Sequence, residues 1–124
     1  ILHRIYSNPN EKIIPLLKEM NQSQIDFLSN IVYEFYTKKR QQLPTIIKSS
    51  WKKDTNQIND SINTLYMIIK LDEYSEIIIR DVLRWVVDDK FWHNNLISLR
   101  GLRKKGNNGH TKFTNIYLSY KRGR

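Results

Sequence analysis

The sequence contains no cysteine and no alanine. Without cysteine, the chain cannot form a disulfide scaffold, ligate zinc or an iron–sulfur cluster through thiolates, or use a thiol as a nucleophile. No apolar run approaches the roughly 18 residues that a membrane span requires, and no signal peptide is recognisable. These absences predict a soluble, cytoplasmic protein with no membrane partner.

The signatures of common catalytic sites are also missing. Neither a G-x-x-x-x-G-K-[ST] phosphate loop nor a G-x-S-x-G nucleophile elbow occurs. The three histidines, His3, His93 and His110, are far apart and have no metal-binding spacing. We therefore expect a protein that is not an enzyme, with no metal and no cofactor.

One short motif needs separate consideration. Asp88, Asp89 and Lys90 form a D-x-K triplet, which metal-dependent nucleases use to hold a cation and to stabilise a developing oxyanion. Those enzymes place a further carboxylate nearby on a β-sheet, but the strict apolar–polar alternation of strands is absent here. We favour the structural interpretation, in which the two aspartates end a helix and start a turn.

Acidic residues are absent from the C-terminal part of the chain. The 124 residues include 21 Lys and Arg against 12 Asp and Glu, which gives a formal net charge of +9. Residues 1–89 hold all 12 acidic residues and 12 basic ones, so residues 90–124 hold the whole surplus. A bias of the genome toward AT-rich codons does not explain this surplus, because it would spread lysine evenly along the chain and would not add arginine. The segregation predicts a surface that contacts a polyanion.

Helix punctuation and apolar spacing predict an all-α fold. A long N-terminal helix is expected over residues 24–43, because its apolar positions recur at helical spacing after a capping serine, Ser23. A compact bundle of about four helices is expected to follow. Its predicted capping residues are Asp54, Ser75, Ser98, whose short helix would run through Lys105, and Thr111.

The length fits one domain with two parts. Residues 1–50 are predicted to form an N-terminal arm and the long helix, and this part is a candidate interaction or dimerisation element. Residues 51–124 are predicted to form the helical bundle with a basic C-terminal DNA-binding surface. Because the chain starts with Ile1 rather than Met, we expect a fragment of a longer protein.

The acid-free segment places basic side chains on both sides of a predicted loop at residues 106–109. We expect this loop to lead into the last helix, where the first backbone N–H groups and the Lys112 side chain would seat a phosphate. Trp92 and His93 fit no helical stripe, so both are kept as candidate contacts. The predicted DNA-contact residues are Arg100, Arg103, Lys104, Lys105, Asn107, Lys112, Lys121, Arg122, Arg124, Trp92 and His93.

Four stretches of the second half, residues 60–65, 71–75, 89–103 and 108–113, carry a pattern of Phe-Trp, a polar pair, Ser-Leu, Leu-Arg and Thr-Lys-Phe. Over residues 54–120 the chain resembles the C-terminal module of phage and mobile-element replication-initiation proteins, the replisome organisers. DnaD-like primosomal proteins share the plan of a small helical C-terminal module. The matching residues are Phe91, Trp92, Ser98, Leu99, Leu102, Arg103, Thr111, Lys112 and Phe113.

The resemblance implies a part in assembling a replication start in a bacterial host. The implied partners are DNA, single- or double-stranded, and a replicative helicase or its loader. The resemblance also supports Arg103 and Lys112 as phosphate contacts, together with the neighbouring Lys104 and Lys105. The residues assigned to packing are Phe91, Leu99, Leu102 and Phe113.

A second hypothesis is a protein-interaction module that docks a helicase, its loader or a second copy of itself, without touching DNA. The predicted helix at 24–43 favours this hypothesis, because its four aromatic side chains exceed what one lone helix can bury. A third hypothesis, a transcriptional repressor of a mobile element, needs a recognition helix that the sequence does not display. The four aromatic residues are Phe27, Tyr33, Phe35 and Tyr36.

Overall fold

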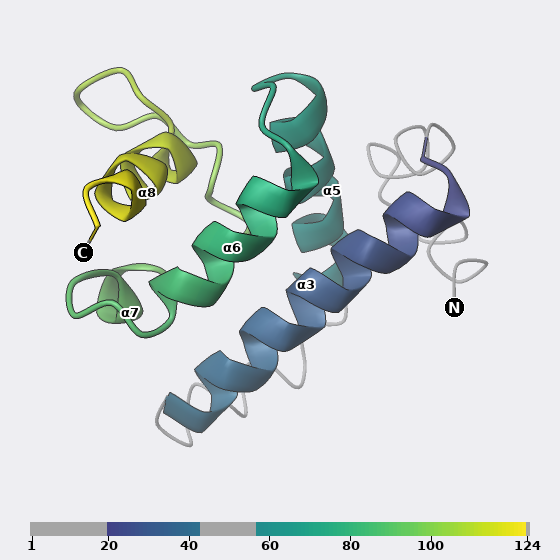
Figure 1. The fold of residues 1–124 in the computed structure, drawn as a ribbon, viewed down its shortest axis with the longest axis horizontal. Coiled ribbons are helices and arrows are strands. Elements are labelled where there is room, and N and C mark those ends of the chain that lie inside the picture. The colour runs from purple at the N-terminus through teal and green to yellow at the C-terminus, as the bar shows by residue number, and fades with distance from the viewer. Residues whose placement is uncertain (1–19, 43–56, 124) are drawn as a thin grey trace.

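The structure, a computed structural model, describes residues 20–42 and 57–123. The described residues form five helices and no β-strand, so the all-α prediction is confirmed (Figure 1). The arm, the Asp54 cap and Arg124 lie outside the described residues. The helices are α3 (Gln22–Gln42), α5 (Gln57–Lys70), α6 (Glu76–Val86), α7 (Trp92–Asn95) and α8 (Lys112–Lys121).

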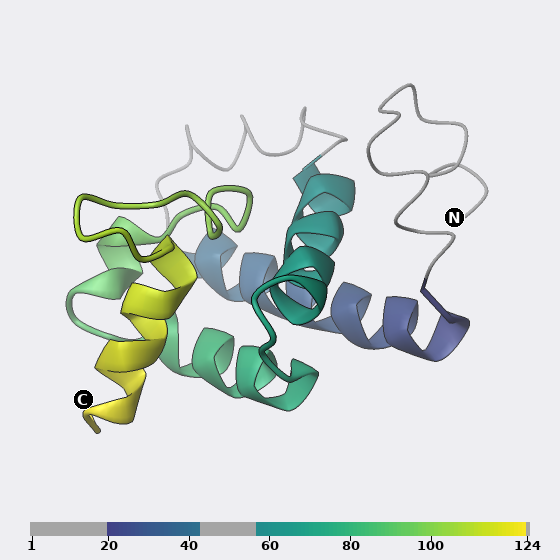
Figure 2. The same ribbon diagram turned by 90° about the horizontal axis from the view of Figure 1, so that it is seen from above.

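The long helix α3 supports the rest of the fold. Both α5 and α6 pack against α3, and α8 packs against α6 on the side away from α3 (Figures 1 and 2). The apolar stripe expected on this helix is buried, including Leu28, Val32 and Phe35. Burial of such a stripe is the main source of stability for an amphipathic helix.

One continuous core connects the helices with the segment after α7. Leu99, Leu102 and Phe113 are fully buried in it, which confirms their assignment to packing. Phe91, the fourth residue assigned to packing, is 51% exposed, so that assignment is wrong. Its neighbour Trp92 packs against the core instead and meets the Phe91 ring edge-on, with 4.8 Å between the ring centroids.

Two of the predicted caps are confirmed. The Ser75 hydroxyl accepts the N–H of Ile78 at 3.2 Å, and Thr111 Oγ1 accepts the N–H of Thr114 at 3.1 Å. Each side chain satisfies one of the N–H groups that a helix start leaves unpaired. The Ser23 cap is wrong: this residue lies inside α3, and Asn21 Oδ1 accepts the N–H of Gln24 at 2.7 Å instead.

The helix predicted from Ser98 through Lys105 does not form. Two successive turns replace it, closed by hydrogen bonds from Leu102 N–H to the Leu99 carbonyl and from Lys104 N–H to the Gly101 carbonyl. Gly101 lies within this segment, and a glycine lowers the helix propensity of the segment that contains it. The burial of Leu99 and Leu102 then decides the path of the backbone. The short helix of this region is α7, which ends at Asn95, before Ser98.

Candidate nucleic-acid interface

The D-x-K triplet forms a turn, as the structural interpretation predicted. Helix α6 ends at Val86, and the buried Asp89 carboxylate accepts the N–H groups of Phe91 and Trp92, each at 3.1 Å. Both hydrogen bonds stabilise the start of α7, where N–H groups otherwise lack partners. Within residues 20–42 and 57–123, no three His, Cys, Asp or Glu side chains gather closely enough to hold a metal ion.

Trp92 and His93 are held by contacts within the fold. His93 Nδ1 lies 2.8 Å from the Asp89 carbonyl oxygen, and the His93 carbonyl accepts a hydrogen bond from the Lys39 ammonium. Trp92 is partly buried against the core. His93 thereby connects α7 to α3, and neither residue lies within the basic loop described below.

Arg103 forms the best-defined ion pair of the predicted set. Its Nε and Nη2 atoms donate to the two Asp72 carboxylate oxygens at 2.9 and 3.1 Å. These hydrogen bonds raise the pKa of Arg103 above its ordinary value. A two-point pair of this kind fixes geometry as well as charge. It ties the turn after Leu102 to the connection between α5 and α6.

Arg100 lies beside a second carboxylate. Its Nε atom is 3.4 Å from Asp60 Oδ2 on α5, and its backbone N–H donates to Ser98 Oγ at 3.3 Å. The two arginines thus face Asp60 on α5 and Asp72 in the connection between α5 and α6. Both arginines belong to the acid-free segment, so these two ion pairs offset part of its positive charge.

Residues 104–112 form an ordered, exposed loop, hereafter the basic loop. An antiparallel bridge pairs Lys105 with Thr111, and the N–H of Gly106 donates to the His110 carbonyl at 2.9 Å. Gly109 has a φ of 82°, a left-handed conformation that glycine adopts without steric cost. Asn108 Nδ2 donates to Asn115 Oδ1 at 2.9 Å and fastens the loop to α8.

The basic loop brings four of the predicted contact residues together. Lys104, Lys105 and Asn107 are exposed, and Lys112 follows the bridge at the first position of α8. Within the described part of the chain, no carboxylate pairs with Lys104 or Lys105. Figures 1 and 2 show the loop projecting from the body beside α8.

The predicted phosphate seat at the start of α8 is wrong in one respect. The N–H of Lys112 donates to the Lys104 carbonyl at 2.9 Å, and the N–H of Phe113 donates to the Leu102 carbonyl at 2.8 Å. The next N–H, that of Thr114, bonds to the Thr111 hydroxyl. Because protein acceptors already occupy all three groups, a phosphate at this place would meet side-chain cations and not the helix amides.

The end of α8 carries the remaining described cations of the predicted set. Lys121 and Arg122 are exposed, and Arg122 Nη2 donates to Ser119 Oγ at 3.2 Å. This anchor keeps the Arg122 side chain against its own helix. The predicted tail therefore begins on ordered structure at the end of the helix that the basic loop leads into.

Tyr36, one of the four aromatic residues of the predicted long helix, organises the segment before the basic loop. The Tyr36 hydroxyl accepts the N–H of Leu99 at 3.0 Å and lies 3.0 Å from Ser61 Oγ and 3.4 Å from Ser98 Oγ. One side chain of α3 thereby satisfies polar groups of α5 and of the turn. Helical spacing predicted its burial but could not predict these partners.

The described residues thus combine an all-α fold with a basic loop that contains no acidic residue. The chain belongs to the family described as phage replication protein O, C-terminal domain, which matches residues 34–108. Its place is therefore in phage replication, and this match confirms the resemblance to the C-terminal module of phage replication-initiation proteins.

The family match differs in extent from the resemblance in the sequence. It begins at Glu34 within α3, earlier than the expected residue 54, and ends at Asn108 within the basic loop. No curated protein and no solved structure shows significant similarity to the chain. Among the described residues, no helix has the length and apolar character needed to cross a membrane.

Proposed function

We propose that this chain is a non-catalytic module of a phage replication initiator that contacts DNA phosphates through the basic loop and helps to recruit the replicative helicase or its loader. The observation that carries the DNA contact is the exposed, hydrogen-bonded loop with Lys104 and Lys105 on it. An ordered loop loses little conformational entropy when it binds. Its cations release counterions from DNA on contact.

We assign different proposed roles to two groups of the predicted cations. Arg103 and Arg100 face carboxylates and position the loop, whereas Lys104, Lys105 and Lys112 are available to phosphates. Lys121 and Arg122 extend the positive surface along α8. Single-stranded and double-stranded DNA both present the phosphates that such a surface recognises.

Charge-neutralising variants test the DNA contact. The double variant Lys104→Gln/Lys105→Gln should bind a labelled DNA duplex and a labelled single strand at least about tenfold more weakly at low salt in fluorescence anisotropy. The matched control is Lys38→Gln/Arg80→Gln, which removes the same charge elsewhere and should keep its affinity. Equal losses in both variants would contradict a localised DNA-binding surface.

A third variant separates positioning from contact. Arg103→Gln should lower the free energy of unfolding by about 1 kcal/mol, because it breaks the two-point pair with Asp72. Thermal unfolding measures this change. Lys104→Gln, at an exposed position, should leave the free energy of unfolding within about 0.5 kcal/mol of the wild-type value.

The alternative function is a protein-interaction module, including self-association, with no direct DNA contact. The aromatic residues of α3 favour it less than the sequence indicated, because Phe35 and Tyr36 are buried in the chain's own core. Tyr33 is 52% exposed and is the one of the four aromatic residues left at the surface. Analytical ultracentrifugation tests the self-association version, which predicts a mass above that of one chain.

A further inference from the structure

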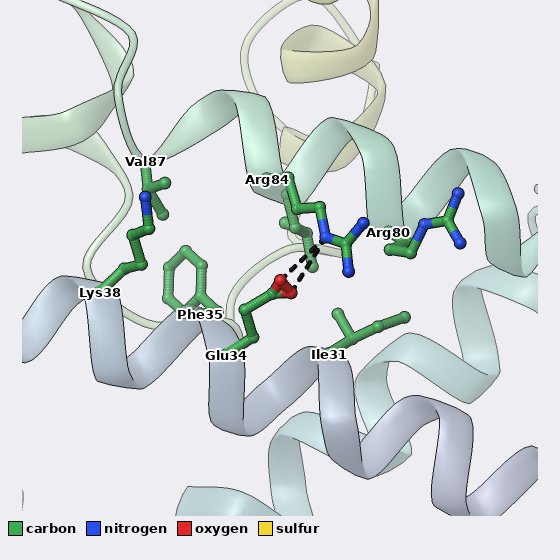
Figure 3. A pocket seen from close by; sticks show the side chains of 8 residues that line it. Ile31, Glu34, Phe35, Lys38, Arg80, Arg84 and Val87 are labelled. Carbon is green, nitrogen blue, oxygen red and sulfur yellow. Dashed lines mark hydrogen bonds and ion pairs between the residues drawn. The ribbon is translucent and has the colours of Figure 1, made fainter.

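A groove runs between α3 and α6, and none of its lining residues belongs to the basic loop (Figure 3). Its volume is about 200 Å³. Four apolar side chains form its floor, and each has an exposed fraction of 5% or less. The floor residues are Ile31, Phe35, Leu83 and Val87.

The rim of this groove is polar, with three cations and one carboxylate. Arg84 Nε donates to both carboxylate oxygens of Glu34, at 2.8 and 3.0 Å, and this ion pair crosses the groove. Figure 3 shows Lys38 toward one end of the groove and Arg80 toward the other. Arg84 thus already engages the one carboxylate of the rim.

The partners of Lys38 and Arg80 lie outside the lining of the groove. Lys38 Nζ is 4.0 Å from Asp88 Oδ2, and both side chains are more than half exposed. Arg80 pairs at 3.0 Å with Asp81, the next residue on the same helix. The exposed Lys38–Asp88 pair contributes little free energy, so an incoming carboxylate can replace Asp88. Arg80 donates to Asp81 from Nε and Nη2, both at 3.0 Å, and its five-donor guanidinium can take a second carboxylate beside Asp81.

We propose that this groove docks an acidic protein segment that inserts one large apolar side chain onto the floor and places carboxylates against Lys38 and Arg80. The volume is smaller than that of a pocket for a drug-sized ligand, and it suits a single anchoring side chain. Anchors of this type, surrounded by charged rims, give much of the affinity when a peptide helix binds in a groove.

The inference rests on the recruitment half of the proposed function and identifies the surface that performs it. DNA is a poorer occupant, because an apolar floor offers nothing to a phosphate and Glu34 would face the DNA backbone. Seven of the eight lining residues fall within residues 34–108, the segment that defines the family. DNA contact and protein recruitment would then use separate surfaces of one small domain.

The probe for this proposal is a fluorescein-labelled peptide of about 12 residues, with one Phe among Asp and Glu residues. It should bind the full chain, and binding should fall about fivefold in Lys38→Gln/Arg80→Gln. Two control peptides, one with Phe replaced by Ala and one with the acidic residues replaced by Lys, should bind more weakly. Lys104→Gln/Lys105→Gln should bind the acidic peptide as the wild type does.

Amide chemical-shift mapping locates the peptide on the chain, which an affinity measurement does not do. Addition of the peptide should move the signals of Ile31, Glu34, Leu83 and Arg84, and addition of a DNA duplex should move those of the basic loop. Peptide-induced shifts confined to the basic loop, or no shifts at all, would overturn the groove proposal. So would groove shifts that appear with DNA, or with rising protein concentration alone. If the chain binds DNA but not the peptide, the groove proposal is wrong and the proposed DNA contact stands. If it binds the peptide but not DNA, only the proposed DNA contact is wrong.

Discussion

Tyr36 illustrates how one polar atom can hold three parts of a small domain together. Its hydroxyl accepts the Leu99 N–H and contacts Ser61 and Ser98 in a largely buried setting. Tyr36→Phe should lower the free energy of unfolding by about 1–3 kcal/mol, because it leaves a buried N–H without an acceptor. Urea denaturation measures this, with Tyr33→Phe at an exposed position of the same helix as the control. Equal, small effects in the two variants would show that the network is not stabilising.

Lys39 is a fully buried cation, and its position gives a specific pH dependence. Its ammonium donates to the His93 carbonyl, and burial lowers its pKa below the ordinary value of 10.5, although the Asp88 charge partly opposes the shift. Between the lowered pKa and 10.5, the unfolded chain binds more protons than the folded chain. The free energy of unfolding should therefore gain a rising contribution as the pH increases through that window.

The variant Lys39→Met tests this contribution, because Met keeps the length of the side chain but cannot titrate. The difference in unfolding free energy between wild type and variant, measured by urea denaturation at several pH values, should shift in favour of the wild type as the pH approaches 10.5. The comparison cancels the titration of the tyrosines, which both proteins share. A difference that stays constant with pH would contradict a lowered pKa at Lys39.

At the scale of elements, the connection between α5 and α6 contains a strained residue. Glu73 has a φ of 62°, the left-handed region that costs a non-glycine residue about 1–2 kcal/mol. Glu73→Gly should therefore be more stable than Glu73→Ala by about 1 kcal/mol, since both lose the carboxylate and only glycine is unstrained there. Thermal unfolding of the two variants decides this. Greater stability of the Ala variant would contradict the strain.

Local signals were sufficient for some elements and insufficient for others. The starts of α6 and α8 were predictable, because Ser75 and Thr111 each bond to an N–H three residues along the chain. The turn at Leu99 was not, because the acceptor of its N–H is Tyr36, 63 residues away. A sequence pattern records neighbours along the chain, whereas this backbone N–H is bonded to a hydroxyl on a distant helix.

The same distinction applies to the candidate site. The exposed lysines of the basic loop could be predicted from the acid-free composition of the segment. The occupied amides of α8 could not, because the carbonyls of Leu102 and Lys104 reach them only after the preceding turns have formed. Arg103 likewise gained its partner, Asp72, from a connection 31 residues earlier. The groove between α3 and α6 required the packing of two helices and left no sequence signal.

The structure shows how the basic residues behind the molecule's net charge of +9 are arranged. Arg100 and Arg103 neutralise carboxylates of α5 and of the connection after it, and the lysines of the basic loop remain at the surface. The groove lies between α3 and α6, separate from the loop. The two surfaces that we propose for DNA and for a protein partner are therefore formed by different elements of the domain.

The salt dependence of DNA binding reports how many phosphates the basic loop contacts. Fluorescence anisotropy of a labelled duplex across a range of NaCl concentrations gives the slope of log K against log salt, about −0.9 for each phosphate contact. We predict a steep slope for the wild type and a slope shallower by about 1–2 for Lys104→Gln/Lys105→Gln, with Lys38→Gln/Arg80→Gln unchanged from the wild type. Identical slopes in the wild type and the loop variant would contradict a DNA contact through the basic loop.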